Sequence, residues 1–302
     1  MKTLRRLLWV AGVLVLTAGI GFLARPVSYF NAGLYLRECF AGVENHSVQV
    51  GGHRVHYLAE GPAGGPPVVL VHGLGGQAED WRNLAPYLVK AGFRVYLPDL
   101  PGFGRSEKPA DFSYSVRDEA EVVVGFLDAL RLKQVYLGGI SMGGAIVQHV
   151  AARQPERVRR LILFDSIGIY EKPAWDTQLF TPTTPAELGQ LDALLMPNPP
   201  KVPGFIALDI LRVSKERAWV IHRSLNAMLT GEDATDNLLP GFKMPVLIVW
   251  GAEDHIAPLS QGETMHRLAP QSRLEVFPGC GHLALIQCAD QIGPKVAEFV
   301  KQ

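Results

Sequence analysis

Residues 135–148 read VYLGGISMGGAIVQ, which places one serine between two pairs of glycines. An apolar run ends at the first pair, and apolar residues at helical spacing follow the second. Glycine weakens both strands and helices, so two pairs around one hydroxyl indicate a backbone that bends sharply in a crowded place. Residues 139–143 match G-x-S-x-G, which in this context presents a serine on a tight turn from a strand into a helix. The pattern predicts that Ser141 lies exposed at the carboxyl end of a strand.

Strands and helices are predicted to alternate along most of the chain. Short, continuously apolar runs that end in turns indicate buried strands. The predicted strands cover residues 53–61, 66–73, 93–102, 134–139, 158–166, 244–251 and 272–279, and the predicted helices cover 115–130, 141–153 and 289–300. This alternation is typical of an α/β fold in which helices cover both faces of a mostly parallel sheet.

Residues 167–240 break this alternation. They are rich in proline and in long apolar helical runs, and they lie between two predicted strands. We therefore expect a helical lid inserted into the domain, whose apolar residues pack onto the core or face a substrate. The chain divides into an N-terminal segment (1–25), a connector (26–46) and one α/β domain (47–302).

The N-terminal segment has the pattern of a membrane anchor. Lys2, Arg5 and Arg6 precede an uncharged apolar run over residues 7–24. Such a run reaches about 27 Å as a helix, close to the ~30 Å hydrocarbon core of a bilayer, and its positive flank is expected to stay in the cytoplasm. We expect a transmembrane helix with the α/β domain on the non-cytoplasmic side, facing the periplasm if the protein is bacterial. A cleaved signal peptide that releases a secreted domain is the alternative.

Charge and cysteine content restrict the classes of partner. Lys plus Arg and Asp plus Glu each number 29, so there is no basic surface for nucleic acid and none is expected as a partner. Cys39, Cys280 and Cys288 lack metal-ligand spacing, and we expect no metal or cofactor. A bridge between Cys280 and Cys288 is conceivable in an exported domain, although the odd count argues against a disulfide framework.

A serine hydroxyl is a weak nucleophile without a neighbouring base. The nucleophile motif calls for an acid and then a histidine later in the chain. Asp254 follows the predicted strand 244–251, and His282 follows the predicted strand 272–279. Parallel sheets place their sites beyond the carboxyl ends of the strands, so we expect Ser141, Asp254 and His282 to meet there as catalytic residues.

Other acids and histidines compete for these roles. Glu253 and His255 flank Asp254, and we interpret Glu253 as solvated and His255 as less well placed than His282. Asp165 ends a predicted strand and is an alternative acid. His149 lies on the helix after the nucleophile, where a structural role is expected.

The oxyanion of a serine-hydrolase intermediate needs backbone N–H donors. Met142 follows the nucleophile, and its N–H is the first expected donor. VHGLGG (71–76) forms a tight turn after a strand, and the N–H of Leu74 is the second. His72 is expected to orient this backbone rather than to transfer protons. DLPGFGRS (99–106) is interpreted as part of the wall of the site.

From about residue 47 to the end, the chain resembles α/β-hydrolases. The matching stretches are VHGLGG, DLPGFGRS, GGISMGG (138–144), WGAEDHIAP (250–258) and GCGH (279–282), in the order typical of that family. Within it, the chain is similar to bacterial membrane-anchored lipases and to monoacylglycerol lipases of the α/β-hydrolase-domain type. The N-terminal segment, Trp81 and TPTTPAEL (181–188) carry this closer similarity.

The resemblance implies a cofactor-free serine hydrolase that cleaves carboxylic esters through an acyl-enzyme. Monoacylglycerols and medium-chain lipid esters are the expected substrates. Carbon–carbon bond hydrolases and perhydrolases with the same three residues are the alternative, and a non-catalytic binding module would be expected to lack one of them. The family usually has Glu and Pro where Gln287 and Ala289 stand, so we expect a looser turn after His282.

Overall fold

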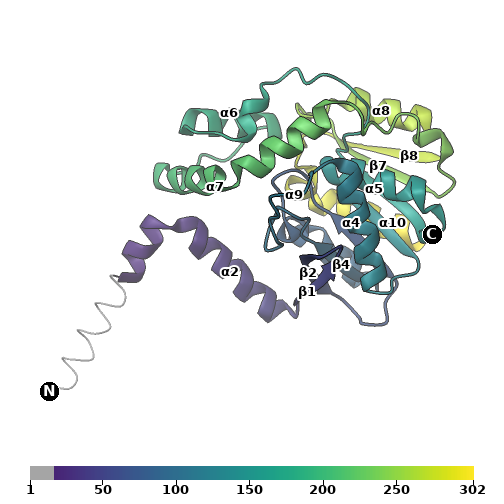
Figure 1. Cartoon of the computed structure of the whole chain (residues 1–302), viewed down its shortest axis with the longest axis horizontal. Coiled ribbons are helices and arrows are strands. Elements are labelled where there is room, and N and C mark those ends of the chain that lie inside the picture. The colour runs from purple at the N-terminus through teal and green to yellow at the C-terminus, as the bar shows by residue number, and fades with distance from the viewer. Residues whose placement is uncertain (1–16) are drawn as a thin grey trace, which may run out of the picture.

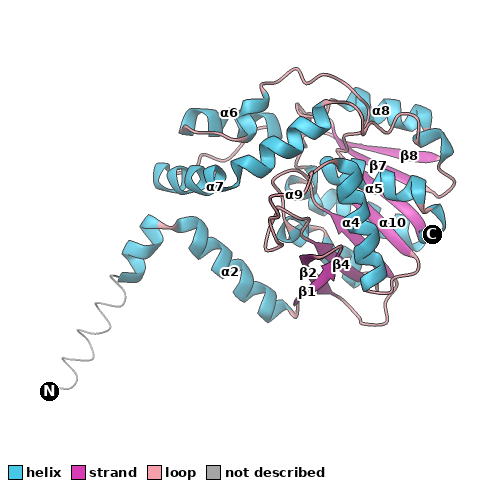
Figure 2. Ribbon diagram, in the orientation of Figure 1, coloured by secondary structure: helices cyan, strands magenta, loops and turns pink. Residues whose placement is uncertain are grey.

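The computed structural model describes residues 17–302. Most of the predicted anchor therefore lies outside the described residues, and only its last part, residues 17–24, is seen as helix. In the described part of the chain, no helix is both long enough and apolar enough to span a bilayer. Figures 1 and 2 show one sheet sandwiched between helices, with an arm of helices that extends from one end of it.

The sheet has eight strands in the order β1-β2-β4-β3-β5-β6-β7-β8. The pairs β1–β2 and β2–β4 are antiparallel, and all later pairs are parallel. The predicted α/β fold with a mostly parallel sheet is confirmed. The strands are β1 (Glu44–Val50), β2 (His53–Glu60), β3 (Pro67–Val71), β4 (Arg94–Pro98), β5 (Val135–Ile140), β6 (Val158–Phe164), β7 (Val246–Gly251) and β8 (Ser272–Phe277).

Both faces of the sheet are covered because successive side chains of a buried strand point to opposite sides. Along β6, Leu161 and Leu163 join one hydrophobic cluster, and Ile162 and Phe164 join the other. The first cluster packs α4 (Val116–Ala129), α5 (Met142–Arg153) and α8 (Leu259–Leu268) onto the sheet. The second packs α3 (Ala85–Lys90), α9 (Ala284–Gln287) and α10 (Ala289–Lys301) onto the opposite face.

The segment between β6 and β7 is largely helical. It contains short 3₁₀ turns at Thr177–Phe180 and Leu239–Gly241, and the helices α6 (Pro185–Leu195) and α7 (Gly204–Leu229). Thr184 accepts a hydrogen bond from the backbone of Glu187 and so caps the start of α6. Figure 1 shows α6 and α7 projecting together from one end of the sheet.

The connector holds two elements that the sequence analysis did not predict. Helix α2 (Pro26–Ala41) has its N-terminus against α7 (Figure 1), and near its other end Glu38 pairs with Arg105 at 3.2 Å. Strand β1 crosses the predicted boundary at residue 47 and pairs along its whole length with β2. Its side chains are mostly exposed, so it lacks the apolar run by which the other strands were recognised.

Candidate active site

Three strand ends bring the predicted polar residues together. Ser141 follows β5, Asp254 lies in the loop after β7 and His282 lies in the loop after β8. The distance from Ser141 Oγ to His282 Nε2 is 2.9 Å, and that from His282 Nδ1 to Asp254 Oδ2 is 2.8 Å. A serine, a histidine and a carboxylate thus form one continuous hydrogen-bonded chain.

Ser141 lies in a strained backbone conformation, with φ 53° and ψ −121°. Left-handed φ values are costly for residues other than glycine and are found where structure around them enforces them. The enforcement here is partly steric, because a side chain on Gly139 would collide with the backbone of Gly143, and one on Gly143 with the end of β3. The paired glycines therefore let β5, the turn and α5 pack closely enough to expose the serine hydroxyl.

Asp254 is buried and well supplied with donors. Its Oδ1 accepts hydrogen bonds from the backbone of Ile256 (2.8 Å) and Ala257 (2.9 Å), while Oδ2 faces His282. Both Asp254 and His282 are shielded from solvent, with 6% and 3% of their surfaces exposed. A carboxylate fixed in this way holds the imidazole in one orientation and one tautomer.

The competing residues take other places. His255 lines a cavity that opens next to Ser141. The backbone N–H of Glu253 donates a hydrogen bond to Cys280 O at 2.9 Å. His149 Nε2 lies 2.9 Å from the carbonyl oxygen of Asp233, which is the structural role expected for it. Asp165 accepts a hydrogen bond from the backbone of Gly251 at 2.7 Å, whereas His282 Nδ1 is bonded to Asp254.

The turn after β3 places Leu74 beside the serine. Gly73 packs against Ser141, since a side chain added there would lie 3.1 Å from its Cβ. His72 holds this turn: Leu100 N donates to its Nε2 (3.0 Å), so the proton must be on Nδ1, which donates to Gly73 O (2.7 Å). In a trans peptide the next N–H points opposite to that carbonyl, so the contact orients the N–H of Leu74.

Met142 is the first residue of α5. The N–H groups of the first helical turn have no acceptor within the helix, and the helix N-terminus carries partial positive charge. The N–H of Met142 is thus available beside Ser141 to a developing negative charge.

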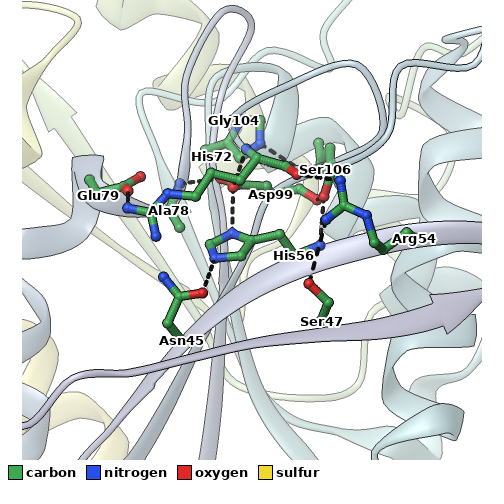
Figure 3. A network of polar contacts seen from close by, with 12 residues as sticks. Asn45, Ser47, Arg54, His56, His72, Ala78, Glu79, Asp99, Gly104 and Ser106 are labelled. Carbon is green, nitrogen blue, oxygen red and sulfur yellow. Dashed lines mark hydrogen bonds and ion pairs between the residues drawn. The ribbon is translucent and has the colours of Figure 1, made fainter. Parts of the chain in front are cut away.

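The DLPGFGRS stretch has a different role from the predicted one. None of residues 99–106, all of which are described, lines the cavity beside Ser141. Instead Asp99 is a fully buried hub between three segments (Figure 3): it accepts from Ala78 N (2.7 Å), Arg105 N (2.8 Å) and His56 Nδ1 (2.7 Å). Burial acts to raise the pKa of Asp99, but these hydrogen bonds, led by His56, bring it below its usual value. Through Ala78, which follows the turn that carries Leu74, this network holds the end of that turn in place.

The loop that carries His282 is closed by a disulfide between Cys280 and Cys288, both buried. The loosened turn expected from Gln287 is not found, because Gln287 Oε1 accepts a hydrogen bond from Gly281 N (3.1 Å). The sequence allowed the Cys280–Cys288 bridge without requiring it. The hydrogen bond between Gln287 and Gly281 had no recognisable sequence pattern.

A cavity of about 160 Å³ opens next to Ser141. Its wall is mainly apolar and comes from the turn after β3, the start of α4, the segment after β6 and the end of α7. Its apolar lining includes Leu74, Val116, Ala145, Ile167, Trp175, Phe180, Leu225, Met228 and Leu229. These lining residues carry no sequence signal of substrate contact, because such apolar side chains are indistinguishable from core residues until the chain is folded.

Comparisons with known proteins agree with this geometry. The family described as the alpha/beta hydrolase fold matches residues 66–220 and 226–288. A 2-hydroxymuconate semialdehyde hydrolase of Pseudomonas sp. (strain CF600) is 32% identical over 263 residues, which cover 79% of this chain and 88% of the relative. Lipase 1 of Psychrobacter immobilis is 26% identical over 263 residues, covering 82% and 81% of the two chains.

A solved structure of a bacterial membrane phospholipase A, described as a virulence factor, has a similar course of the chain throughout. It superposes with a TM-score of 0.84 at 27% identity, and the match covers 100% of this chain and 98% of the other.

Proposed function

This chain belongs to the α/β-hydrolase fold family and is a hydrolase, and we propose that it cleaves carboxylic esters of lipids through an acyl-enzyme formed on Ser141. The observation that carries the proposal is the hydrogen-bonded chain from Ser141 through His282 to Asp254 beside an apolar cavity.

The proposed mechanism follows from the geometry. Ser141 Oγ attacks the ester carbonyl carbon while His282 Nε2 takes the hydroxyl proton. Asp254 accepts a hydrogen bond from His282 Nδ1 and stabilises the resulting imidazolium. The N–H groups of Leu74 and Met142 stabilise the tetrahedral oxyanion. His282 then protonates the leaving alcohol, and a water molecule activated by the same imidazole releases the carboxylic acid and restores Ser141.

The cavity supports an apolar acyl group as the bound part of the substrate. Charged residues are few along its lining, and the acids Glu171 and Asp233 accompany Lys172 there. An aliphatic chain gains about 0.8 kcal/mol for each CH₂ that it buries. A carboxylate on the bound part of the substrate would instead lie near the acidic side chains of Glu171 and Asp233. Monoacylglycerols and medium-chain lipid esters therefore remain the first substrates to test.

The proposed location is the non-cytoplasmic side of a membrane, with residues 1–25 as the anchor. Disulfides persist mainly in oxidising compartments, and the Cys280–Cys288 bridge supports an exported domain. The similarity over the full chain to a membrane phospholipase A also supports this location. The exposed tyrosines of α2, Tyr29 and Tyr35, are of the type enriched at membrane interfaces, and the exposed Phe30 and Phe40 add apolar surface to the same helix.

Carbon–carbon bond hydrolysis is the second candidate. The similarity to a 2-hydroxymuconate semialdehyde hydrolase, at 32% identity, favours it. The same serine and histidine would serve there, so the two candidates differ in the bond cleaved rather than in the residues proposed to act.

The decisive experiment is hydrolysis of acyl esters from acetate to long chains, together with monoacylglycerols, by the chain that lacks residues 1–25. Ser141→Ala serves as the blank, and fluorophosphonate labelling counts the active serines. We expect a rate that peaks at medium or long acyl chains.

A rate that falls steeply after butyrate would indicate a small-ester esterase. Labelled enzyme that leaves every ester intact but cleaves a dienoate meta-cleavage product would indicate carbon–carbon hydrolysis. Absence of both labelling and turnover would contradict the serine-hydrolase proposal.

A further inference from the structure

The turn that follows β6 contacts the strand ends on both sides of it. Its first residue, Asp165, is fully buried and has φ 42°, a left-handed value that is uncommon outside glycine. His282 Nδ1 is bonded to Asp254 and not to Asp165. A buried acid in a strained turn next to the reacting residues therefore needs another explanation.

On one side, this turn holds the backbone of Ser141. Ser141 N donates to Phe164 O at 3.0 Å, and Ile167 N donates to Ser141 O at 3.2 Å. Both backbone polar groups of the serine are thus bound by residues that flank Asp165.

On the other side, Asp165 holds the end of β7. Asp165 N donates to Val249 O at 2.9 Å, and Gly251 N donates to Asp165 Oδ1 at 2.7 Å. Gly251 O accepts from Asp254 N at 3.3 Å, so the same peptide segment leads directly into the loop of the acid. The side chain of Asp165 thus adds one hydrogen bond to the β6–β7 pairing at Gly251, the last residue of β7 before the loop that carries Asp254.

The two neighbouring carboxyl groups have unequal environments. Three N–H groups donate to Asp254, from Ile256, Ala257 and His282. Asp165 accepts from Gly251 alone at Oδ1, and its buried Oδ2 has no hydrogen-bond partner in the described part of the chain. Burial and the nearby charge of Asp254 both raise the pKa of Asp165 well above its usual value. The hydrogen-bond donors of this region are thus directed mainly at Asp254, the carboxylate that contacts His282.

We propose that Asp165 is a positioning residue of the hydrolytic reaction. Through its bonds to Val249 and Gly251 it braces the ends of β6 and β7, and so sets the placement of Asp254 and His282 relative to Ser141, without supplying a charge to His282. This role rests on the proposed serine-hydrolase function.

The test compares Asp165→Ala with Asp165→Asn, and uses Asp111→Ala on an exposed loop as the matched control. The rate of labelling by a fluorophosphonate is measured from pH 5 to pH 9, beside ester turnover and thermal unfolding. Asp165→Ala removes the brace, and a displacement of about 1 Å can lower reactivity by about 100-fold. We expect its labelling rate and kcat to fall by about 10- to 100-fold, with KM little changed. Asp165→Asn keeps the acceptor for Gly251 and should restore most of the loss.

The pH profile separates this role from a charged one. Asp165→Asn replaces a neutral acid by a neutral amide. The pH at which the labelling rate falls on the acid side should therefore be the same as in the wild type. Removal of a real charge close to His282 would lower that pH by about one unit. Such a shift, or labelling of Asp165→Ala at the wild-type rate, would overturn the proposal.

Two further outcomes are distinguishable. If Asp165→Ala does not fold, the profile of Asp165→Asn still decides whether the acid is neutral. If the wild-type protein is labelled but hydrolyses no ester, the substrate class fails while the labelling rates still test Asp165. A wild-type protein that is not labelled would contradict the serine-hydrolase function itself.

Discussion

At the scale of single residues, the site depends on groups that act as one unit. Ser141 and Asp254 are both bonded to His282, at 2.9 Å and 2.8 Å. None of them performs its proposed step alone, because the hydroxyl needs the imidazole as a base and the imidazole needs the carboxylate to orient it.

This interdependence predicts non-additive losses. Ser141→Ala or His282→Ala should each lower turnover by about 10⁴- to 10⁶-fold, and the double variant should lose little more. Asp254→Asn should lower turnover by about 10⁴-fold by stabilising the wrong imidazole tautomer. Steady-state rates of the single and double variants test this, and losses that multiply would contradict the assignment.

A second residue-scale prediction concerns Glu119 in the first turn of α4. It is 1% exposed, and its carboxyl oxygens have no hydrogen-bond partner in the described part of the chain. Burial, with a smaller effect of Asp118, raises the pKa of Glu119 well above its usual value. At pH values between the ordinary and the raised pKa, the Glu119 carboxyl is ionised in the unfolded chain but still protonated in the folded chain. The contribution of Glu119 to stability therefore falls as pH rises.

Glu119→Gln cannot ionise, so its stability relative to wild type should grow with pH from about pH 4.5. Within the titration range the gain should approach about 1.4 kcal/mol per pH unit. Urea unfolding at a series of pH values measures it, with the half-exposed Glu121→Gln as the control. Parallel curves for wild type and Glu119→Gln would show that Glu119 is ionised in the fold.

At the scale of elements, each acting residue lies on the loop after a strand, and each loop is held by contacts of its own. The turn after β3 relies on His72 and Asp99, and the loop after β8 relies on the Cys280–Cys288 bridge and on Gln287. The strands set the approximate meeting place, and these local contacts decide the final geometry.

The bridge yields an element-scale prediction. It joins residues eight positions apart, and closing so short a loop stabilises by about 2–3 kcal/mol in the chain-entropy treatment. Replacing both Cys280 and Cys288 by Ala should lower Tm by about 3–5 °C and reduce turnover, because His282 lies inside the loop. Thermal unfolding and ester assays measure both effects, and Cys39→Ser at the exposed free cysteine is the control. Unchanged Tm and turnover would mean that the bridge supports neither.

At the scale of the whole molecule, the inserted helix α7 connects the site to the N-terminal helices. Its C-terminal part lines the cavity with Leu225, Met228 and Leu229. Near its N-terminus, the buried Asp209 accepts a hydrogen bond from Val27 N (3.0 Å) and lies 3.8 Å from Arg25. Phe22 also meets Phe205 of α7, with ring centroids 6.0 Å apart. The end of the proposed anchor (Phe22 and Arg25) and the start of α2 (Val27) are thus attached to the helix that lines the cavity beside Ser141.

Loss of this attachment should loosen the N-terminal part of α2, whereas Glu38 near its other end stays paired with Arg105. Asp209→Ala removes the acceptor at its N-terminus, so we expect chymotrypsin to cleave at the exposed aromatic residues of α2 several-fold faster, since cleavage follows local opening. Glu216→Ala is the matched control, because Glu216 pairs with Arg212 of the same helix and not with α2. Mass spectrometry of timed digests measures the cleavage, and equal rates for the two variants would show that Asp209 does not hold α2.

The sequence by itself determined the α/β architecture, the order Ser141, Asp254, His282 and the turns that present them. Continuous apolar runs and paired glycines leave few alternatives for a backbone, because burial and steric contact act locally and periodically. Helix α2 and strand β1 escaped recognition because one is mostly exposed and the other lacks an apolar run.

Only the tertiary structure decided which groups meet across long separations in the chain. From the sequence Asp165 was an alternative acid until the bond of His282 to Asp254 was seen, and Asp99 was part of a site wall until His56 and Ala78 were found bonded to it. The cavity lining was likewise hidden among residues that read as core. Side-chain hydrogen bonds and cavities depend on distances that packing sets to within a fraction of an ångström, and no local pattern encodes those distances.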